Sequence, residues 1–105
     1  MSSPDHPPEG FVLHTRHSPL TEPWEPLFAR EVGNAVHLGL RVREAHCNSR
    51  GFAHGGLVSA LADNAMGLSA VAAARAAGTA EGKRAVTVSL NLDFLDSARI
   101  GQWLT

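Results

Sequence analysis

The sequence is poor in cysteine and in aromatic side chains: its 105 residues include one cysteine, Cys47, two tryptophans, four phenylalanines and no tyrosine. A single cysteine excludes a disulfide within the chain and fits a reducing compartment. The first ten residues, MSSPDHPPEG, contain neither a basic stretch nor an apolar segment, so they predict no signal peptide. We therefore expect a cytoplasmic protein.

Charge of either sign is also scarce. Nine basic residues stand against ten acidic ones, the formal net charge is −1, and neither sign forms a run. This excludes a basic surface of the kind that binds nucleic acid or an anionic membrane, so we expect neither partner. The hydrophobic share of 44% and the charged share of 18% are typical of a globular chain, and the length allows a single core.

The most distinctive segment runs from His54 to Ala77, where two glycines open a long alanine-rich run. It is apolar on nearly every side, which predicts a helix enclosed in a protein core or set in a membrane. Asp63 and Asn64 would be expensive in hydrocarbon, so we expect a core helix. Asp63 is then either a satisfied core carboxylate, hydrogen-bonded for instance to Ser59, or a functional acid.

Strand-like alternation flanks this helix on both sides. Apolar residues recur at alternate positions from Val36 to His46 and, more cleanly, from Val86 to Phe94, which predicts two half-buried strands. Residues 100–105 look like the beginning of a further strand. Residues 1–19, rich in proline, are expected to form a disordered or loosely packed leader to a domain over residues 20–105.

Several kinds of site fit the sequence poorly. Ser69 lies inside the predicted helix and lacks the closing glycine of a nucleophile elbow. His46, Cys47, His54 and Asp63 match no metal-ligand spacing, and the glycines fit neither the dinucleotide nor the P-loop pattern. We therefore expect no metal site and no bound cofactor.

What remains is a helix N-terminus with free backbone amides, together with a carboxylate farther along the helix. This pair suits addition to a carbonyl group, because the amides stabilise the developing oxyanion while the carboxylate assists attack. Gly55 and Asp63 are eight residues apart, which is about 12 Å along one helix. They cannot reach one carbonyl together, so if they cooperate they must come from two chains.

The segment Asn48–Gly56, NSRGFAHGG, followed by Asp63 gives the spacing N-x5-HGG-x6-D. Over residues 20–105 the sequence strongly resembles the hotdog-fold acyl-CoA thioesterases of the phenylacetate-degradation (PaaI-like) type. The resemblance implies an α+β fold, in which an antiparallel sheet wraps around the long helix, and a homodimer or homotetramer with composite sites between protomers. Covering such a helix takes about five strands, so we expect that this chain is C-terminally truncated and lacks the family's last strands.

The resemblance also implies a reaction, hydrolysis of an acyl-CoA thioester to a free acid and coenzyme A, with coenzyme A as part of the substrate. The backbone N–H of Gly55 would polarise the thioester carbonyl, and Asp63 of the partner subunit would be the nucleophile or general base. Thr87 would position water beside that acid, although alone it is an ordinary strand threonine.

Three further residues take roles from the resemblance. His54 would hold the loop and the carbonyl end of the substrate, Asn48 would orient the attacking water or the thioester, and Gly56 would let the acyl chain or pantetheine pass close to the backbone. Taken alone, His54 fits a helix cap better than a ligand, and Asn48 fits a turn residue; the HGG-x6-D context favours the functional role of His54. Two other functions stay open: a non-catalytic acyl-CoA-binding or regulatory module, in which Asp63 is structural, and enoyl-CoA hydration, whose aspartate and histidine motif is not found.

Overall fold

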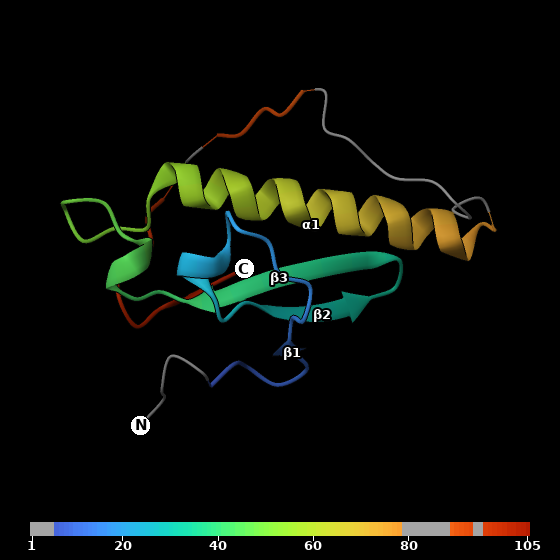
Figure 1. Ribbon diagram of the computed structural model, residues 1–105, viewed down its shortest axis with the longest axis horizontal. Coiled ribbons are helices and arrows are strands. Elements are labelled where there is room, and N and C mark those ends of the chain that lie inside the picture. The colour runs from blue at the N-terminus through green and yellow to red at the C-terminus, as the bar shows by residue number, and fades with distance from the viewer. Residues whose placement is uncertain (1–5, 79–88, 94–95) are drawn as a thin grey trace.

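An antiparallel sheet carries one long helix across one of its faces (Figure 1). The computed structural model describes residues 6–78, 89–93 and 96–105. Its four strands, in the order β1-β2-β3-β4 across the sheet, are β1 (Val12–Leu13), β2 (Phe28–Val32), β3 (Ala35–Arg41) and β4 (Trp103–Leu104). The helix is α1 (Gly55–Ala76), and two single 3-10 turns are η1 (Glu22–Trp24) and η2 (Glu44–His46). The predicted architecture, an antiparallel sheet against a long helix, is confirmed.

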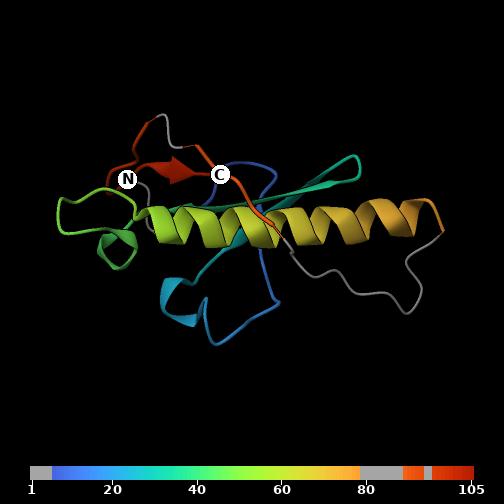
Figure 2. The same ribbon diagram turned by 90° about the horizontal axis from the view of Figure 1, so that it is seen from above.

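The hairpin β2–β3 forms the centre of the sheet. Val32 pairs with Ala35, so the loop is two residues long, and its first residue, Gly33, has a φ of 59° that glycine adopts without strain. The alternation predicted for β3 places Leu38 and Leu40 among the buried residues. In Figures 1 and 2, α1 lies over this hairpin and runs antiparallel to β3, so that its first turns lie near the end of the strand.

The core lies between β3 and the first half of α1. It consists of the buried side chains Leu27, Leu40, Val42, Leu57 and Leu61. Farther along the helix, the Ser69 hydroxyl bonds both the N–H and the carbonyl oxygen of Val36, at 2.9 and 3.3 Å. The N-terminal end of α1 is thus fixed by apolar packing, and its middle is fixed to the start of β3 by a polar contact.

The strand predicted over residues 36–46 is shorter than expected. β3 ends at Arg41, and residues 44–46 form the turn η2, closed by bonds from His46 N–H to the Arg43 carbonyl and from Cys47 N–H to the Glu44 carbonyl at 2.9 and 3.0 Å. The alternation continues to Val42, which is buried, but the local hydrogen bonds of the turn replace strand pairing beyond it.

The prediction of a strand from Val86 to Phe94 is wrong for residues 89–93, the part of it that the structure describes. Residues 89–93 have no strand structure, and 86–88 and 94 lie outside the described residues. Figure 1 places the segment 89–93 on the side of α1 away from the sheet, where no strand runs beside it. Alternation makes one face apolar, but a strand also needs a neighbour for its backbone hydrogen bonds.

The predicted span of the helix is confirmed, since α1 ends at Ala76, but the expected enclosure is found only in part among the described residues. Leu57 and Leu61 are its buried residues, and Met66 on the outer face is 49% exposed. The physical reason is coverage: 22 helical residues extend about 33 Å, whereas the seven residues of β3 extend about 23 Å. By length and composition α1 could also cross a membrane, a test that core helices of soluble proteins pass as well.

The face of the sheet away from α1 carries an aromatic cluster. Trp103 packs against Phe11 and Phe28, with ring centroids 5.0 and 5.9 Å apart. Gly39 makes room for it, because a Cβ there would overlap the Trp103 ring. The edge strand β1, which lies within the segment predicted to be a loose leader, pairs with β2 next to this cluster.

Candidate active site

The N-terminus of α1 presents a backbone donor without an acceptor. His54 is the N-cap residue, and its Nδ1 accepts the N–H of Gly56 at 2.8 Å. The N–H of Gly55, the first helical residue, has no hydrogen-bond acceptor among the described residues. The helix dipole adds a partial positive charge at this point. Gly55 can therefore bind a carbonyl oxygen or an anion.

The loop before the helix is built around Asn48. Its Oδ1 accepts the backbone N–H groups of Arg50 and Phe52 at 2.9 and 3.2 Å, and its own N–H donates to the Phe52 carbonyl. A bridge between Cys47 and Ala53 closes the loop. Because two N–H groups fix the orientation of the carboxamide, Asn48 has only its NH₂ left, which can donate to a ligand but cannot accept from one.

A second segment, Asp96–Arg99, forms the opposite wall. It is held to the loop by the bond from Ala53 N–H to the Ala98 carbonyl at 2.8 Å and by a bridge between Phe52 and Arg99. The Arg99 guanidinium lies over the Phe52 ring, 5.2 Å from its centroid. Residues more than forty positions apart thus share one rim.

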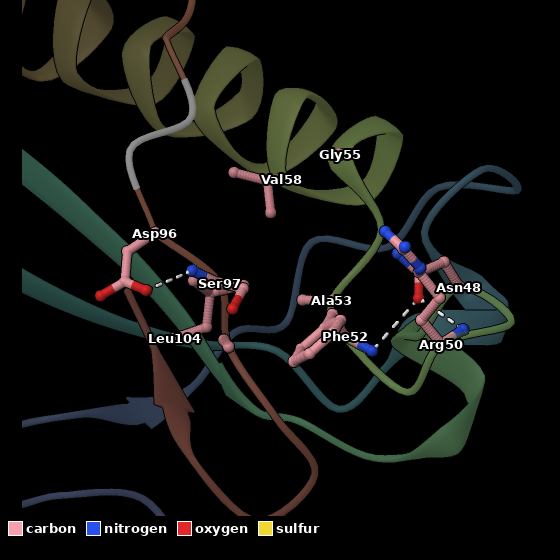
Figure 3. Close-up of a pocket in the computed structure, with 10 residues that line it drawn as sticks. Asn48, Arg50, Phe52, Ala53, Gly55, Val58, Asp96, Ser97 and Leu104 are labelled. Carbon is pink, nitrogen blue, oxygen red and sulfur yellow. Dashed lines mark hydrogen bonds between the residues drawn. The ribbon is translucent and has the colours of Figure 1, made fainter.

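Between these walls lies a cavity of about 380 Å³. Figure 3 shows Asn48 and Arg50 on one side, Asp96 and Ser97 on the other, and Val58 of α1 facing the space between them. The cavity is lined by Asn48, Arg50, Phe52, Ala53, Gly55, Val58, Asp96, Ser97, Ala98 and Leu104. It has the volume and the mixed apolar and polar lining of a small-molecule site.

The structure brings together only part of the predicted site. Asn48 and Gly55 line the cavity, whereas Asp63, half-buried two turns along α1, does not. The Ser59 hydroxyl, considered as a partner of Asp63, donates to the Gly55 carbonyl at 2.8 Å. Thr87 lies outside the described residues. One chain alone does not place a carboxylate from α1 beside the Gly55 amide.

His54 and Gly56 form a local unit at the cavity's edge without lining it. A Cβ on Gly56 would lie 3.0 Å from His54 Nδ1, so the small residue lets the imidazole reach the amide that it caps. His54 is therefore a helix cap, which is one of the two roles considered for it from the sequence. Among the residues that the structure describes, no three His, Cys, Asp or Glu side chains gather in a way that could hold a metal ion.

Sequence reasoning missed the cavity residues Arg50, Asp96 and Ser97, and also Arg99 on its rim. Arg50 lies inside the N-x5-HGG motif, at a position to which the motif assigns no role. Asp96 and Arg99 come from a distant turn whose place is set by two bridging contacts. Hydrophobic periodicity does not indicate such long-range contacts. The one feature of the sequence that could have suggested this rim is Arg50, a charged residue inside the motif.

Comparisons with known proteins identify the family of this chain. Residues 50–105 match the family model described as Thioesterase superfamily. The chain is 43% identical over 98 residues to the protein named "Putative esterase PA0474" of Pseudomonas aeruginosa, an alignment that covers 92% of this chain and 69% of that protein. The family match includes Gly55 and Asp63.

Proposed function

Because this chain belongs to the thioesterase superfamily, whose members have the hotdog fold, we propose that it hydrolyses acyl-CoA thioesters to a free acid and coenzyme A. The family and the esterase-named relative support a hydrolase of thioesters or esters. The observation that carries the finer proposal is the N–H of Gly55, which lacks an acceptor among the described residues and belongs to a cavity-lining residue at the N-terminus of α1.

The first part of the reaction is polarisation of the substrate carbonyl. The thioester oxygen accepts the Gly55 N–H, where the helix dipole stabilises the negative charge that grows as the carbon becomes tetrahedral. Asn48 lines the same cavity, and its NH₂ can donate a second hydrogen bond or orient the attacking water. His54 keeps the Gly56 amide occupied, so the carbonyl is directed to Gly55.

The second part needs an acid group from another chain. We propose a homodimer, or a pair of dimers, in which Asp63 of the partner subunit faces the Gly55 amide. As a base it takes a proton from water, the water oxygen bonds to the carbonyl carbon, and the C–S bond breaks as the coenzyme A sulfur leaves and is protonated. Thr87 would position that water, and Gly56 would let the pantetheine pass. No cofactor takes part.

Charge at the cavity rim favours coenzyme A as the carrier of the acyl group. Arg50 and Arg99 are both exposed, and neither forms an ion pair with any residue in the described ranges. Guanidinium groups bind phosphates through paired hydrogen bonds. They could therefore hold the phosphates of coenzyme A while the acyl chain enters beside Phe52 and Val58.

A second function, an acyl-CoA-binding module without catalysis, is favoured by one observation: within a single chain the cavity lacks Asp63. The two functions differ in what Asp63→Asn does. If the enzyme reading is right, thiol release from acyl-CoA falls by about 10²- to 10⁴-fold, while acyl-CoA binding measured by calorimetry persists.

Asp96→Asn is the matched control, since Asp96 is a carboxylate that lines the cavity of the same chain. We expect it to keep most of the hydrolysis. Loss of turnover in Asp96→Asn together with unchanged turnover in Asp63→Asn would overturn the assigned role of Asp63. Binding of acyl-CoA without turnover by the unaltered protein would favour the binding module.

A further inference from the structure

Two side chains, those of Arg43 directly before η2 and of His46 at its end, bind the backbone of η1. Three successive carbonyl oxygens accept their hydrogen bonds: Arg43 Nη2 donates to those of Pro23 and Glu25 at 3.2 and 2.7 Å, and His46 Nε2 lies 2.8 Å from that of Trp24. The side chains of Arg43 and His46 thus join η2 to η1 through hydrogen bonds to backbone carbonyl groups.

The protonation state of His46 follows from its partners. The ring belongs to a residue that is 2% exposed, and its Nδ1 lies 3.0 Å from the backbone nitrogen of Arg43. A backbone N–H can only donate, so Nδ1 carries no proton and Nε2–H donates to the Trp24 carbonyl. An imidazolium would set a second N–H against the Arg43 N–H, and that bond would be lost.

His46 is also bonded to the start of α1. Its backbone carbonyl accepts the N–H of His54 at 2.9 Å. His54 is the N-cap and immediately precedes Gly55. A shift of His46 therefore acts directly on the residue that sets the position of the Gly55 amide.

We propose that His46 is a positioning residue: its neutral, buried ring fixes the His54 cap and the Gly55 amide for the substrate carbonyl, and protonation of the ring releases them. The inference rests on the proposed function for its effect on turnover. Its structural part, the coupling of the His46 ring to the Gly55 amide, is independent of any reaction.

The surroundings oppose protonation. Burial lowers the pKa of His46, the bond to the Trp24 carbonyl raises it, and the Arg43 guanidinium lowers it further. The other charged or titratable groups on the elements packed around the ring are Glu22 of η1 and Glu25 at its C-cap, Glu44 of η2 and Cys47 at its C-cap, and His54. Because the folded pKa lies below 6.5, the ring's contribution to stability is complete above pH 6.5 and is lost as the pH falls from there toward the folded pKa.

The test compares pH profiles of kcat for the unaltered protein and His46→Asn, whose Oδ1 can still accept the Arg43 N–H but cannot titrate. In the unaltered protein we expect kcat to fall by about tenfold per pH unit below the His46 midpoint, with the fold retained by circular dichroism. In His46→Asn this acid limb should be absent. His14→Asn is the control, because burial also lowers the pKa of His14, which lies beside β1, away from the cavity. An acid limb unchanged in His46→Asn, or one removed by His14→Asn, overturns the proposal.

Nuclear magnetic resonance separates this inference from the proposed function. In the unaltered protein without substrate, the Gly55 amide shift should move with the same midpoint as the His46 ring shifts. This readout holds even if the variant does not fold or no acyl-CoA is hydrolysed. A Gly55 amide that does not follow the His46 ring overturns the positioning role, whether or not the protein is a thioesterase.

Discussion

Replacing Gly55 by proline removes the proposed oxyanion donor and little else. Gly55 is the first residue of α1, where proline is well tolerated because its missing N–H has no intrahelical acceptor. The preceding residue, His54, has φ −69° and ψ 135°, the extended conformation that proline requires of its predecessor. The substitution therefore tests the amide itself and not the helix.

The expected loss of kcat is that of removing one hydrogen-bond donor from the oxyanion site. Removing one oxyanion donor from a preorganised site costs about 2.7–4 kcal/mol of transition-state stabilisation, or about 10²- to 10³-fold in kcat. The assay is release of coenzyme A thiol, with the melting temperature and acyl-CoA binding measured in parallel. Gly55→Ala is the matched control, since it also replaces the glycine but keeps the N–H. A Gly55→Pro protein that is folded and turns over within about threefold of Gly55→Ala would refute the reasoning.

Three further predictions concern other parts of the structure. Arg50→Ala should raise KM for acyl-CoA and leave KM and kcat for a phosphate-free acyl ester unchanged. An equal rise of KM for both substrates in steady-state assays would count against a phosphate contact. Gly39→Ala should cost about 1–3 kcal/mol in urea unfolding, because its Cβ would overlap Trp103, and a neutral result would contradict that packing. His54→Ala should lower unfolding stability by about 1 kcal/mol through loss of the cap on Gly56, whereas unchanged stability would show that the cap contributes nothing.

The sequence predicts the local elements of this fold well. The alternation around Leu38 and Leu40 identifies a face of β3, and the glycine after the alanine-rich run marks the end of α1. The pairing of Asn48 and Gly55 at one site follows from their place in a single short motif. Each of these features is set by residues close together in the chain, where periodicity and turn chemistry are informative.

The features that escaped prediction depend on distant parts of the chain. Residues 89–93 alternate like a strand, but the part of the chain that the structure describes offers them no neighbouring strand with which to pair. The rim formed by Phe52 and Arg99 exists because a bridge joins two remote loops. Whether α1 is covered depends on the length of the sheet beneath it and not on the composition of the helix.

The most direct test of the account combines two inactive proteins. Gly55→Pro keeps Asp63, and Asp63→Asn keeps the Gly55 amide, so a mixed dimer of the two contains one site with both groups intact. If the amide and the acid come from different subunits, refolding the two variants together restores about a quarter of the unaltered activity, because half of the dimers are mixed and each has one working site. If the mixture stays as inactive as its components although mixed dimers form, the two-subunit site is wrong.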